Sequence, residues 1–92
     1  MTYEWDPRKA AGNARKHRVT FVEASTVFRD HLAVTYPDPD HSIGEQRFIT
    51  IGLSSRGNVL LVAHAENDDR VRIISARRAT RRESHAYTQG LL

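Results

Sequence analysis

Three strand-like stretches follow one another in the second half of the chain and restrict its possible folds more than any other feature. They cover residues 47–53, 59–65 and 70–76. The first carries isoleucine or leucine at alternate positions, which indicates one buried face, and the second is almost continuously apolar, which indicates burial on both faces. Turn-forming residues fill the two gaps, 54–58 and 67–69. The pattern predicts an antiparallel meander of central strands.

Two short helices are predicted in the first half of the chain. Asp6 can cap a helix over residues 7–16, which starts at a proline whose missing amide hydrogen costs nothing there. The alanines of this helix are candidate core residues, whereas its glycine and asparagine weaken the helical pattern. Thr20 and Glu23 have the spacing of a capping box and predict a second helix over residues 21–28.

The remaining segments predict two short strands, one loop and a terminal helix. The strands are expected at residues 2–5 and 32–36, and the loop at residues 37–44. Thr80 and Glu83 form a second capping-box pattern, which begins a helix through about Thr88, with Gly90 available to end it. The whole predicts a single α/β domain of the α+β type over residues 1–92, in which two N-terminal helices and one C-terminal helix flank a central antiparallel sheet.

Positive charge is concentrated in the C-terminal half. Residues 1–46 contain six basic and seven acidic side chains, whereas residues 47–92 contain eight basic and four acidic ones. Six arginines and no acidic residue occupy positions 70–82. Arginine binds phosphate through two parallel hydrogen bonds and stays charged at physiological pH, so RNA, DNA or an acidic protein is the expected partner. A solvated charged surface on an ordinary small domain would show the same composition.

Side-chain alternation along the third strand predicts which arginines share a face. It places Arg70, Arg72, Ile74 and Ala76 on one face and Val71, Ile73 and Ser75 on the other. The terminal helix adds further basic side chains next to this strand, namely Arg78, Arg81, Arg82 and His85. We therefore expect one contiguous basic surface.

His64 and Glu66 are the best candidates for acid–base chemistry. They share one face of the apolar strand, and the following turn would set Arg70 and Arg72 beside them. RNA cleavage without a metal needs a group that takes the proton from the ribose 2′-hydroxyl and cations that stabilise the phosphorane. Arginine suits only the second role. The structural alternative is a Glu66 paired with arginine across two strands and a His64 satisfied by a neighbour.

Metal, disulfide and membrane chemistry have little support in the sequence. The chain has no cysteine, and Asp38, Asp40 and His41 lie in a proline-rich loop, where such residues more often form turns than ligand sets. No apolar run approaches the roughly 20 residues of a membrane-spanning helix, and the first residues lack a signal-peptide pattern. We expect no metal, no cofactor, no membrane association and a cytoplasmic location. Tyr87, on the basic helix, suits either a core or stacking on RNA bases.

Several segments, in their order and spacing, resemble the BrnT family of bacterial type II toxins over nearly the whole chain. They are Tyr3-Glu4-Trp5-Asp6, Lys16-His17, Val19-Thr20-Phe21-Val22-Glu23-Ala24, Val27-Phe28, Gly44-Glu45-Gln46-Arg47, Ile51-Gly52 and Arg70-Val71-Arg72-Ile73-Ile74-Ser75-Ala76-Arg77. The resemblance implies a RelE-like toxin that cuts RNA to halt translation. It also implies a BrnA-like antitoxin that covers the arginine-rich face in an assembly of two toxins and two antitoxins. DNA binding would then belong to the antitoxin complex.

The resemblance carries the family's polar positions onto nine residues. They are Arg47, His64, Glu66, Arg70, Arg72, Ser75, Arg77, Glu83 and Tyr87. We expect Arg72 and Arg77 to hold the scissile phosphate and Glu66 or His64 to transfer protons. The RNA-binding set is Arg47, Arg70, Arg78, Arg81, Arg82 and Tyr87. A non-catalytic nucleic-acid-binding module, or an inactive toxin kept as an interaction subunit, would use the same arginines differently.

Two positions depart from the pattern of the family. Arg18 stands where the family usually has the glycine that ends the first helix, so either the turn avoids a left-handed backbone or Arg18 adopts it with some strain. The turn at residues 67–69 replaces a short glycine-containing turn and adds negative charge near the expected site. Neither change removes a candidate catalytic group.

Overall fold

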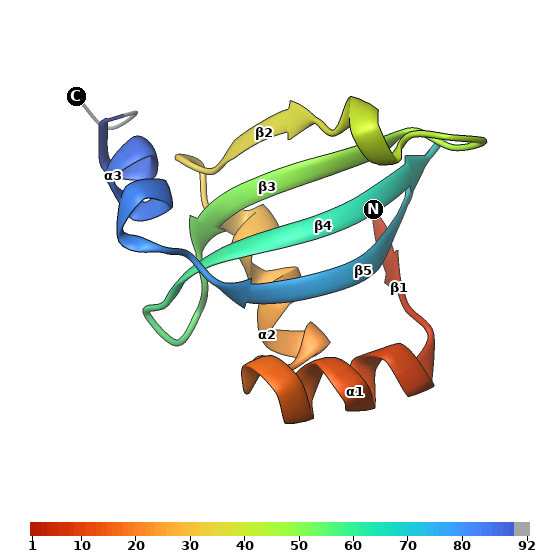
Figure 1. The fold of residues 1–92 in the computed structure, drawn as a ribbon, viewed down its shortest axis with the longest axis horizontal. Helices are drawn as coiled ribbons and strands as arrows, with labels where there is room; N and C mark the ends of the chain where they lie inside the picture. The colour runs from red at the N-terminus through yellow and green to blue at the C-terminus, as the bar shows by residue number, and fades with distance from the viewer. Residues whose placement is uncertain (90–92) are drawn as a thin grey trace.

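The computed structural model describes residues 1–89, which form an α+β fold around a five-stranded sheet (Figure 1). In chain order the elements are β1 (Thr2–Glu4), α1 (Pro7–His17), α2 (Phe21–Ser25), the 3₁₀ turn η1 (Thr26–Arg29), β2 (Val34–Pro37), the 3₁₀ turn η2 (Pro39–His41), β3 (Arg47–Leu53), β4 (Val59–Asn67), β5 (Arg70–Arg78) and α3 (Arg81–Gln89). The α+β class is as predicted. The expected helix end at Gly90 lies outside the described residues.

The sheet is mixed rather than wholly antiparallel. Its strand order is β1-β5-β4-β3-β2, and the predicted meander of β3, β4 and β5 is confirmed as a series of antiparallel pairs. The edge strand β2 also pairs with β3 in antiparallel fashion. The first strand, however, pairs with β5 in parallel, with Tyr3 opposite Val71. A three-residue strand has too short a pattern to indicate its partner, and the pairing joins the two ends of the sequence. The sequence therefore did not predict it.

Local capping residues start the helices where the sequence predicted. The Oδ1 atom of Asp6 accepts hydrogen bonds from the amides of Arg8 at 2.7 Å and Lys9 at 3.3 Å, and Thr20 Oγ1 accepts from the amide of Glu23 at 3.0 Å. The second predicted helix is shorter than expected, because its last residues wind into the tighter turn η1. Arg18 adopts the left-handed conformation, with φ of 58°, and its amide donates to Ala14 O. Of the two options for this turn, Arg18 therefore adopts the left-handed backbone with some strain.

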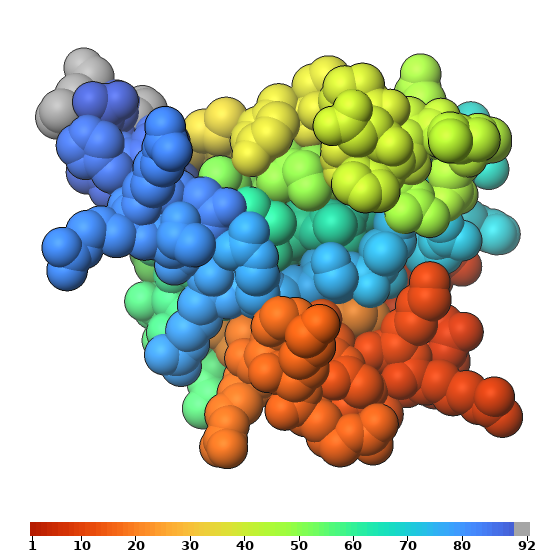
Figure 2. Space-filling view, in the orientation of Figure 1, coloured from red at the N-terminus to blue at the C-terminus, as the bar shows by residue number. Residues whose placement is uncertain are grey.

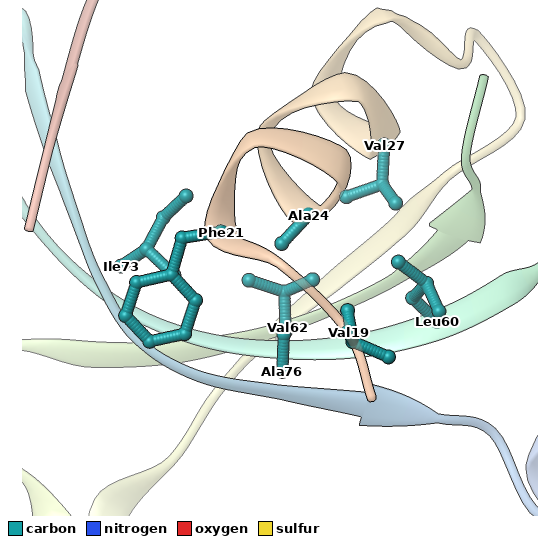
Figure 3. Packing of buried hydrophobic residues seen from close by; sticks show 8 residues of the cluster. All are labelled: Val19, Phe21, Ala24, Val27, Leu60, Val62, Ile73 and Ala76. Carbon is teal, nitrogen blue, oxygen red and sulfur yellow. The ribbon is translucent and has the colours of Figure 1, made fainter. Parts of the chain in front are cut away.

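The hydrophobic core lies between α1, α2 and one face of the sheet, here called the helix-side face (Figure 1). Its buried members are Val19, Phe21, Ala24 and Val27 from the helical region and Leu60, Val62, Ile73 and Ala76 from β4 and β5 (Figure 3). Gly52 permits the close approach of this layer, because an added Cβ would lie 2.9 Å from the Cβ of Ala33. The opposite face, here called the open face, is covered by α3 at one end, and the loop between β2 and β3 reaches over it at the other.

Two buried polar side chains fasten the helices to the sheet. The Asn13 side chain donates to Val19 O at 3.0 Å and to Ala76 O at 2.8 Å, and accepts from Ala76 N at 3.1 Å. The residue that weakened the helical pattern is thus an anchor of α1, whereas Ala11, a candidate core residue, is exposed. The Glu23 carboxylate accepts from Ser54 Oγ and Asn58 Nδ2 of the β3–β4 turn instead of closing its capping box. Burial works to raise the pKa of Glu23, but these hydrogen bonds lower it overall.

Candidate functional site

A β-bulge in β5 decides which arginines share a face. Ala63 pairs with Ser75 and His64 pairs with Ile73, so Ile74 is an extra residue on β5. The strict alternation expected from the sequence therefore fails beyond Ile73. Ala76 belongs to the helix-side core. Ser75 pairs with Ala63 and lies on the open face.

The bulge places Arg72 and Arg77 on the same open face. Arg77 is five positions after Arg72, an odd spacing that would put the two side chains on opposite faces of a regular strand. Arg77 lies next to the buried Ala76 and therefore points away from the helices. Arg72 likewise precedes the buried Ile73. Unbroken alternation would have put the two guanidinium groups on opposite faces of the sheet.

Arg72 lies at one end of β5 in a surface pocket of about 470 Å³, here called the Arg72 pocket. Its lining comprises Glu4, Gly44, Glu45, Gln46, Ala65, Glu66, Asn67, Arg70 and Arg72. The Arg72 guanidinium donates to Glu45 Oε1, and Arg47 Nε donates to the same oxygen at 3.3 Å. The Arg72 and Glu45 side chains remain 45% and 37% exposed, respectively. The pocket therefore combines accessible arginines with carboxylates.

Arg77 lies near the other end of β5 and forms a different kind of pair. Its two terminal nitrogens donate to the two oxygens of Glu83 at 2.7 and 2.9 Å. The predicted capping box is confirmed, because Thr80 N donates to Glu83 Oε1 and Glu83 N donates to Thr80 Oγ1. The hydrogen bonds from Arg77, with those from Thr80, hold the pKa of Glu83 down to about 2, and Glu83 in turn raises the pKa of Arg77.

The two preferred cations therefore do not share a pocket. Their positions on β5 are separated by roughly 15 Å at the usual rise per residue of a strand. A different carboxylate also holds each guanidinium. The expectation that Arg72 and Arg77 together hold one phosphate has no support in this arrangement.

His64 is fully buried on the helix-side face and is not brought to the arginines. Its Nε2 lies 2.7 Å from Thr50 Oγ1, and its ring packs against Phe28 and Phe48, with ring centroids 4.9 and 5.9 Å away. Burial lowers its pKa to about 4, so the ring is neutral at pH 7. Its Nδ1 lies 3.5 Å from Glu66 Oε1 and has no hydrogen-bond partner among the described residues. Glu66 follows on the same face of β4, because it pairs with the buried Val71, but it is exposed at the end of the strand and also lines the Arg72 pocket.

The basic surface expected from the sequence is divided rather than contiguous. One part of it, Arg70 and Arg72, lies at the start of β5. The other part, the exposed Arg81 and Arg82, lies on α3, which follows the opposite end of β5 (Figure 1). In Figure 2 the blue side chains of α3 gather at one end of the molecule, and the yellow-green loop before β3 lies toward the other. Arg78 pairs with the buried Leu60 and so lies on the helix-side face.

Tyr87 is a core residue rather than an exposed stacking platform. Its ring is buried, and its hydroxyl donates to Asp30 Oδ2 at 2.5 Å. Burial and this hydrogen bond raise the pKa of Tyr87 to about 12. Asp30 also accepts from the amides of Leu32 and Leu53, so the contact ties α3 to the start of β2 and the end of β3. The hydroxyl is therefore already engaged.

Glu45 is the site residue that reasoning from residue types did not single out. It appeared only within a string shared with the BrnT family, because a lone carboxylate in a loop carries no periodic or motif signal. In the nearby loop, His41 Nδ1 lies 3.0 Å from Asp38 Oδ2. Residues 1–89 contain no cluster of three His, Cys, Asp or Glu side chains placed to hold a metal ion. No helix in this range has the length and apolar character to cross a membrane.

Comparison with known proteins agrees with the fold and the resemblance. The family model described as "Ribonuclease toxin, BrnT, of type II toxin-antitoxin system" matches residues 5–83. The crystal structure of the Brucella abortus ribonuclease toxin BrnT has a similar fold, with a TM-score of 0.68 and 20% sequence identity over 88% of this chain and 100% of that one. None of the curated proteins matches the chain. Because the family match spans most of the sequence, this chain belongs to the BrnT family, the ribonuclease toxins of type II toxin–antitoxin systems.

Proposed function

We propose that this toxin cleaves RNA in the Arg72 pocket and does so without a metal ion. The observation that carries the proposal is the gathering of Arg70 and Arg72 with Glu45 and Glu66 around one accessible hollow. Arginines can stabilise a phosphorane, and a carboxylate can accept a proton, so this pocket holds both kinds of group that the reaction needs. The hollow at the other end of the open face is mainly apolar.

In the proposed reaction, the Glu66 carboxylate accepts the proton of a ribose 2′-hydroxyl. The 2′-oxygen attacks the adjacent phosphorus, and the bond to the 5′-oxygen breaks, which leaves a 2′,3′-cyclic phosphate and a 5′-hydroxyl that is completed by a proton from water. Arg70 and Arg72 bind the phosphate oxygens, whose negative charge grows in the transition state. His64 keeps the inner side of β4 packed and makes no contact with RNA.

Glu45 holds Arg72 of this pocket and the neighbouring Arg47 in position before RNA arrives. It contacts Arg72 through one terminal nitrogen and Arg47 through Nε. A guanidinium has five N–H donors, so Arg72 keeps most of its donors available for a phosphate. Arg47 and the exposed Arg81 and Arg82 would then contact phosphates on either side of the cleaved bond. Arg77 acts by fixing the start of α3.

The partner of a type II toxin is an antitoxin. We propose that a BrnA-like antitoxin neutralises this toxin in an assembly of two copies of each protein, and that DNA binding belongs to that assembly. RNA cleavage by the free toxin in the cytoplasm then halts translation. Fold likeness to the RelE-type ribonucleases stays a prediction.

The test measures cleavage of labelled single-stranded RNA by the purified chain in EDTA. We expect cleavage with 2′,3′-cyclic phosphate ends, and we expect Glu66→Gln to slow it by about 10²- to 10⁴-fold while RNA binding is kept, because only proton transfer is lost. Arg15→Ala, an exposed position on α1, is the control and should cleave as the wild type does.

Three results would contradict the proposal. Full activity of Glu66→Gln would place the base elsewhere, and cleavage that stops in EDTA would exclude a metal-independent reaction. Intact RNA that binds tightly and in a strongly salt-dependent manner would identify a non-catalytic nucleic-acid-binding module instead.

A further inference from the structure

We infer that the groove between β2 and α3, here called the β2–α3 groove, is the docking surface for an extended acidic and apolar segment of the antitoxin. The groove has a volume of about 350 Å³. Its lining comes from the sheet and from α3 and comprises Val34, Tyr36, Ile51, Arg82, Glu83, Ala86 and Tyr87. This inference rests on the proposed neutralisation by an antitoxin and does not depend on which pocket cleaves RNA.

The groove presents apolar surface that no described residue covers. Val34 is 40% exposed and Tyr36 is 42% exposed, and both belong to the outermost strand of the sheet. Leu53, also exposed, follows Ile51 on the same face of β3. Apolar side chains that gather around a groove on a small protein mark an interaction surface more often than scattered ones do. The outer edge of β2 adds unpaired backbone donors and acceptors.

The groove is already formed in the isolated chain. The hydrogen bond from the Tyr87 hydroxyl to Asp30 holds α3 against the sheet. At the other side of the helix, the paired hydrogen bonds between Arg77 and Glu83 fix its first turn and compensate the charge of the one carboxylate in the lining. A partner that binds here does not need to order the surface first, which lowers the entropic cost of binding.

The chemistry of the groove favours a protein segment over a nucleobase. A bound base needs hydrogen-bonding groups for its polar edges, but the lining is mainly apolar and the Tyr87 hydroxyl is engaged with Asp30. An extended peptide can instead pair with the free edge of β2 and insert alternate apolar side chains. The exposed Arg81 and Arg82 have no carboxylate partner among the described residues, so they suit acidic side chains of that segment.

The position of the groove separates antitoxin binding from the proposed chemistry. Figure 1 shows α3 at one end of the sheet and the loop between β2 and β3 at the other. Residues of α3 line the groove, and Gly44 and Glu45 of that loop line the Arg72 pocket, so the two hollows lie toward opposite ends. A segment anchored in the groove would allow the rest of the antitoxin to cover the open face between the two ends. A chain with a blocked groove should therefore still cleave RNA but escape neutralisation.

The experiment uses two groove variants of the full chain, Val34→Asp and Ala86→Glu. Each places a carboxylate in the apolar lining, where it would repel an acidic segment, and both positions are solvent-exposed, so folding should be preserved. The matched controls are Val22→Asp, at a position that is 65% exposed on α2, and Ala11→Glu, on the exposed side of α1. The probe is the purified protein from the reading frame beside the gene of this chain.

We expect calorimetric titration to show weaker binding of that protein to both groove variants, by about 30-fold or more, the effect of removing an interface hot spot. Both controls should bind as the wild type does. Single-turnover RNA cleavage in EDTA with saturating toxin, measured in parallel, should stay within about twofold for all four variants. None of these positions lies in the Arg72 pocket, and saturation offsets a weaker contact between RNA and the nearby Arg82. Circular dichroism confirms that each variant is folded.

Other outcomes overturn the inference. Unchanged binding by both groove variants excludes the groove as the docking surface. Loss of RNA cleavage with unchanged antitoxin binding assigns the groove to RNA, and a wild-type dimer that the groove variants disrupt, again with unchanged antitoxin binding, assigns it to a second copy of the chain. Failure of the wild type to bind the neighbouring protein contradicts the proposed partner as well as the inference.

Discussion

Two arginine–glutamate pairs on the open face of β5 differ in how firmly the carboxylate is held. Glu83, 24% exposed, makes two parallel hydrogen bonds to Arg77 and closes a capping box with Thr80. Glu45 contacts Arg72 through one oxygen, which it shares with Arg47, and it lies in a loop. The pairs use the same residue types on the same strand, so residue type alone does not determine their roles.

The difference teaches that the anchorage of the carboxylate decides whether an arginine is available to a ligand. Both terminal nitrogens of Arg77 already donate to Glu83, so a phosphate can bind this edge of the guanidinium only by displacing Glu83, whose charge would then lose its main partner at the start of α3. Arg72 keeps free N–H donors and is solvent-exposed. The first pair is therefore part of the framework, and the second is part of the proposed binding pocket.

The largest effect expected from this difference between the two pairs is on RNA cleavage. Arg72→Ala should slow cleavage by about 10²- to 10³-fold, because it removes a donor to the charged transition state. The cleavage rate of Arg77→Ala should stay within about tenfold of the wild-type rate, at a temperature at which the variant remains folded. Single-turnover cleavage of labelled RNA measures both variants, and the opposite order of effects would show that the firmly held pair is the catalytic one.

A second prediction sharpens the contrast between the open face and the helix-side face. Burial lowers the folded pKa of His64 to about 4, below the ordinary histidine value of 6.5. The buried neutral ring therefore stabilises the folded chain fully above pH 6.5. As the pH falls from 6.5 to 4, the free energy of unfolding of the wild type should decrease by on the order of 3 kcal/mol. In His64→Phe this loss should be absent, because the ring cannot be protonated in the unfolded chain.

Urea unfolding at several pH values measures this difference, and RNA cleavage by His64→Phe provides the control. Cleavage should stay within about threefold of the wild type at pH 7, because the ring lies behind β4 and touches no pocket residue other than Glu66. Loss of cleavage in a folded His64→Phe would instead make His64 the proton-transfer group that the sequence also suggested.

The smallest effect concerns stability at the two glutamates. Glu83→Gln should lower the free energy of unfolding by about 1 to 2 kcal/mol at pH 7, since it weakens hydrogen bonds to a charged group. The matched variant Glu45→Gln should change it by less than about 0.5 kcal/mol, because its pair is exposed.

The pH dependence provides a second measurement for Glu83. Its folded pKa of about 2 lies below the ordinary value of 4.5, so its stabilisation is present above pH 4.5 and is lost as the pH falls toward 2. Glu83→Gln should remove this part of the acid unfolding curve. Equal stability losses in the two glutamate variants at pH 7 would show that the two pairs are held alike.

Much of the fold was predictable because its signals are local in the sequence. The strand predicted at residues 47–53 is confirmed with the same bounds, and the strands that follow extend only two residues beyond their predicted ends. The caps at Asp6, Thr20 and Thr80 are also confirmed. A hydrophobic period or a capping residue acts within a few positions, so it can be recognised without knowledge of the partner.

The candidate site was less predictable because it depends on contacts between distant parts of the chain. The charge pattern indicated the right strand, and Glu66 and Arg72 do line one pocket. The bulge at Ile74, however, depends on how β5 pairs with β4 and on the Asn13 amide that holds Ala76. No period in the sequence marks the extra residue.

By itself, the sequence determined the order of the helices and strands, the meander and the basic strand at its edge, because neighbouring residues encode these features. Only the tertiary structure decided that Arg72 and Arg77 share a face, that separate carboxylates hold them and that His64 is enclosed among aromatic rings. These outcomes arise from packing and pairing across the sheet, where the partners of each residue lie far away along the chain.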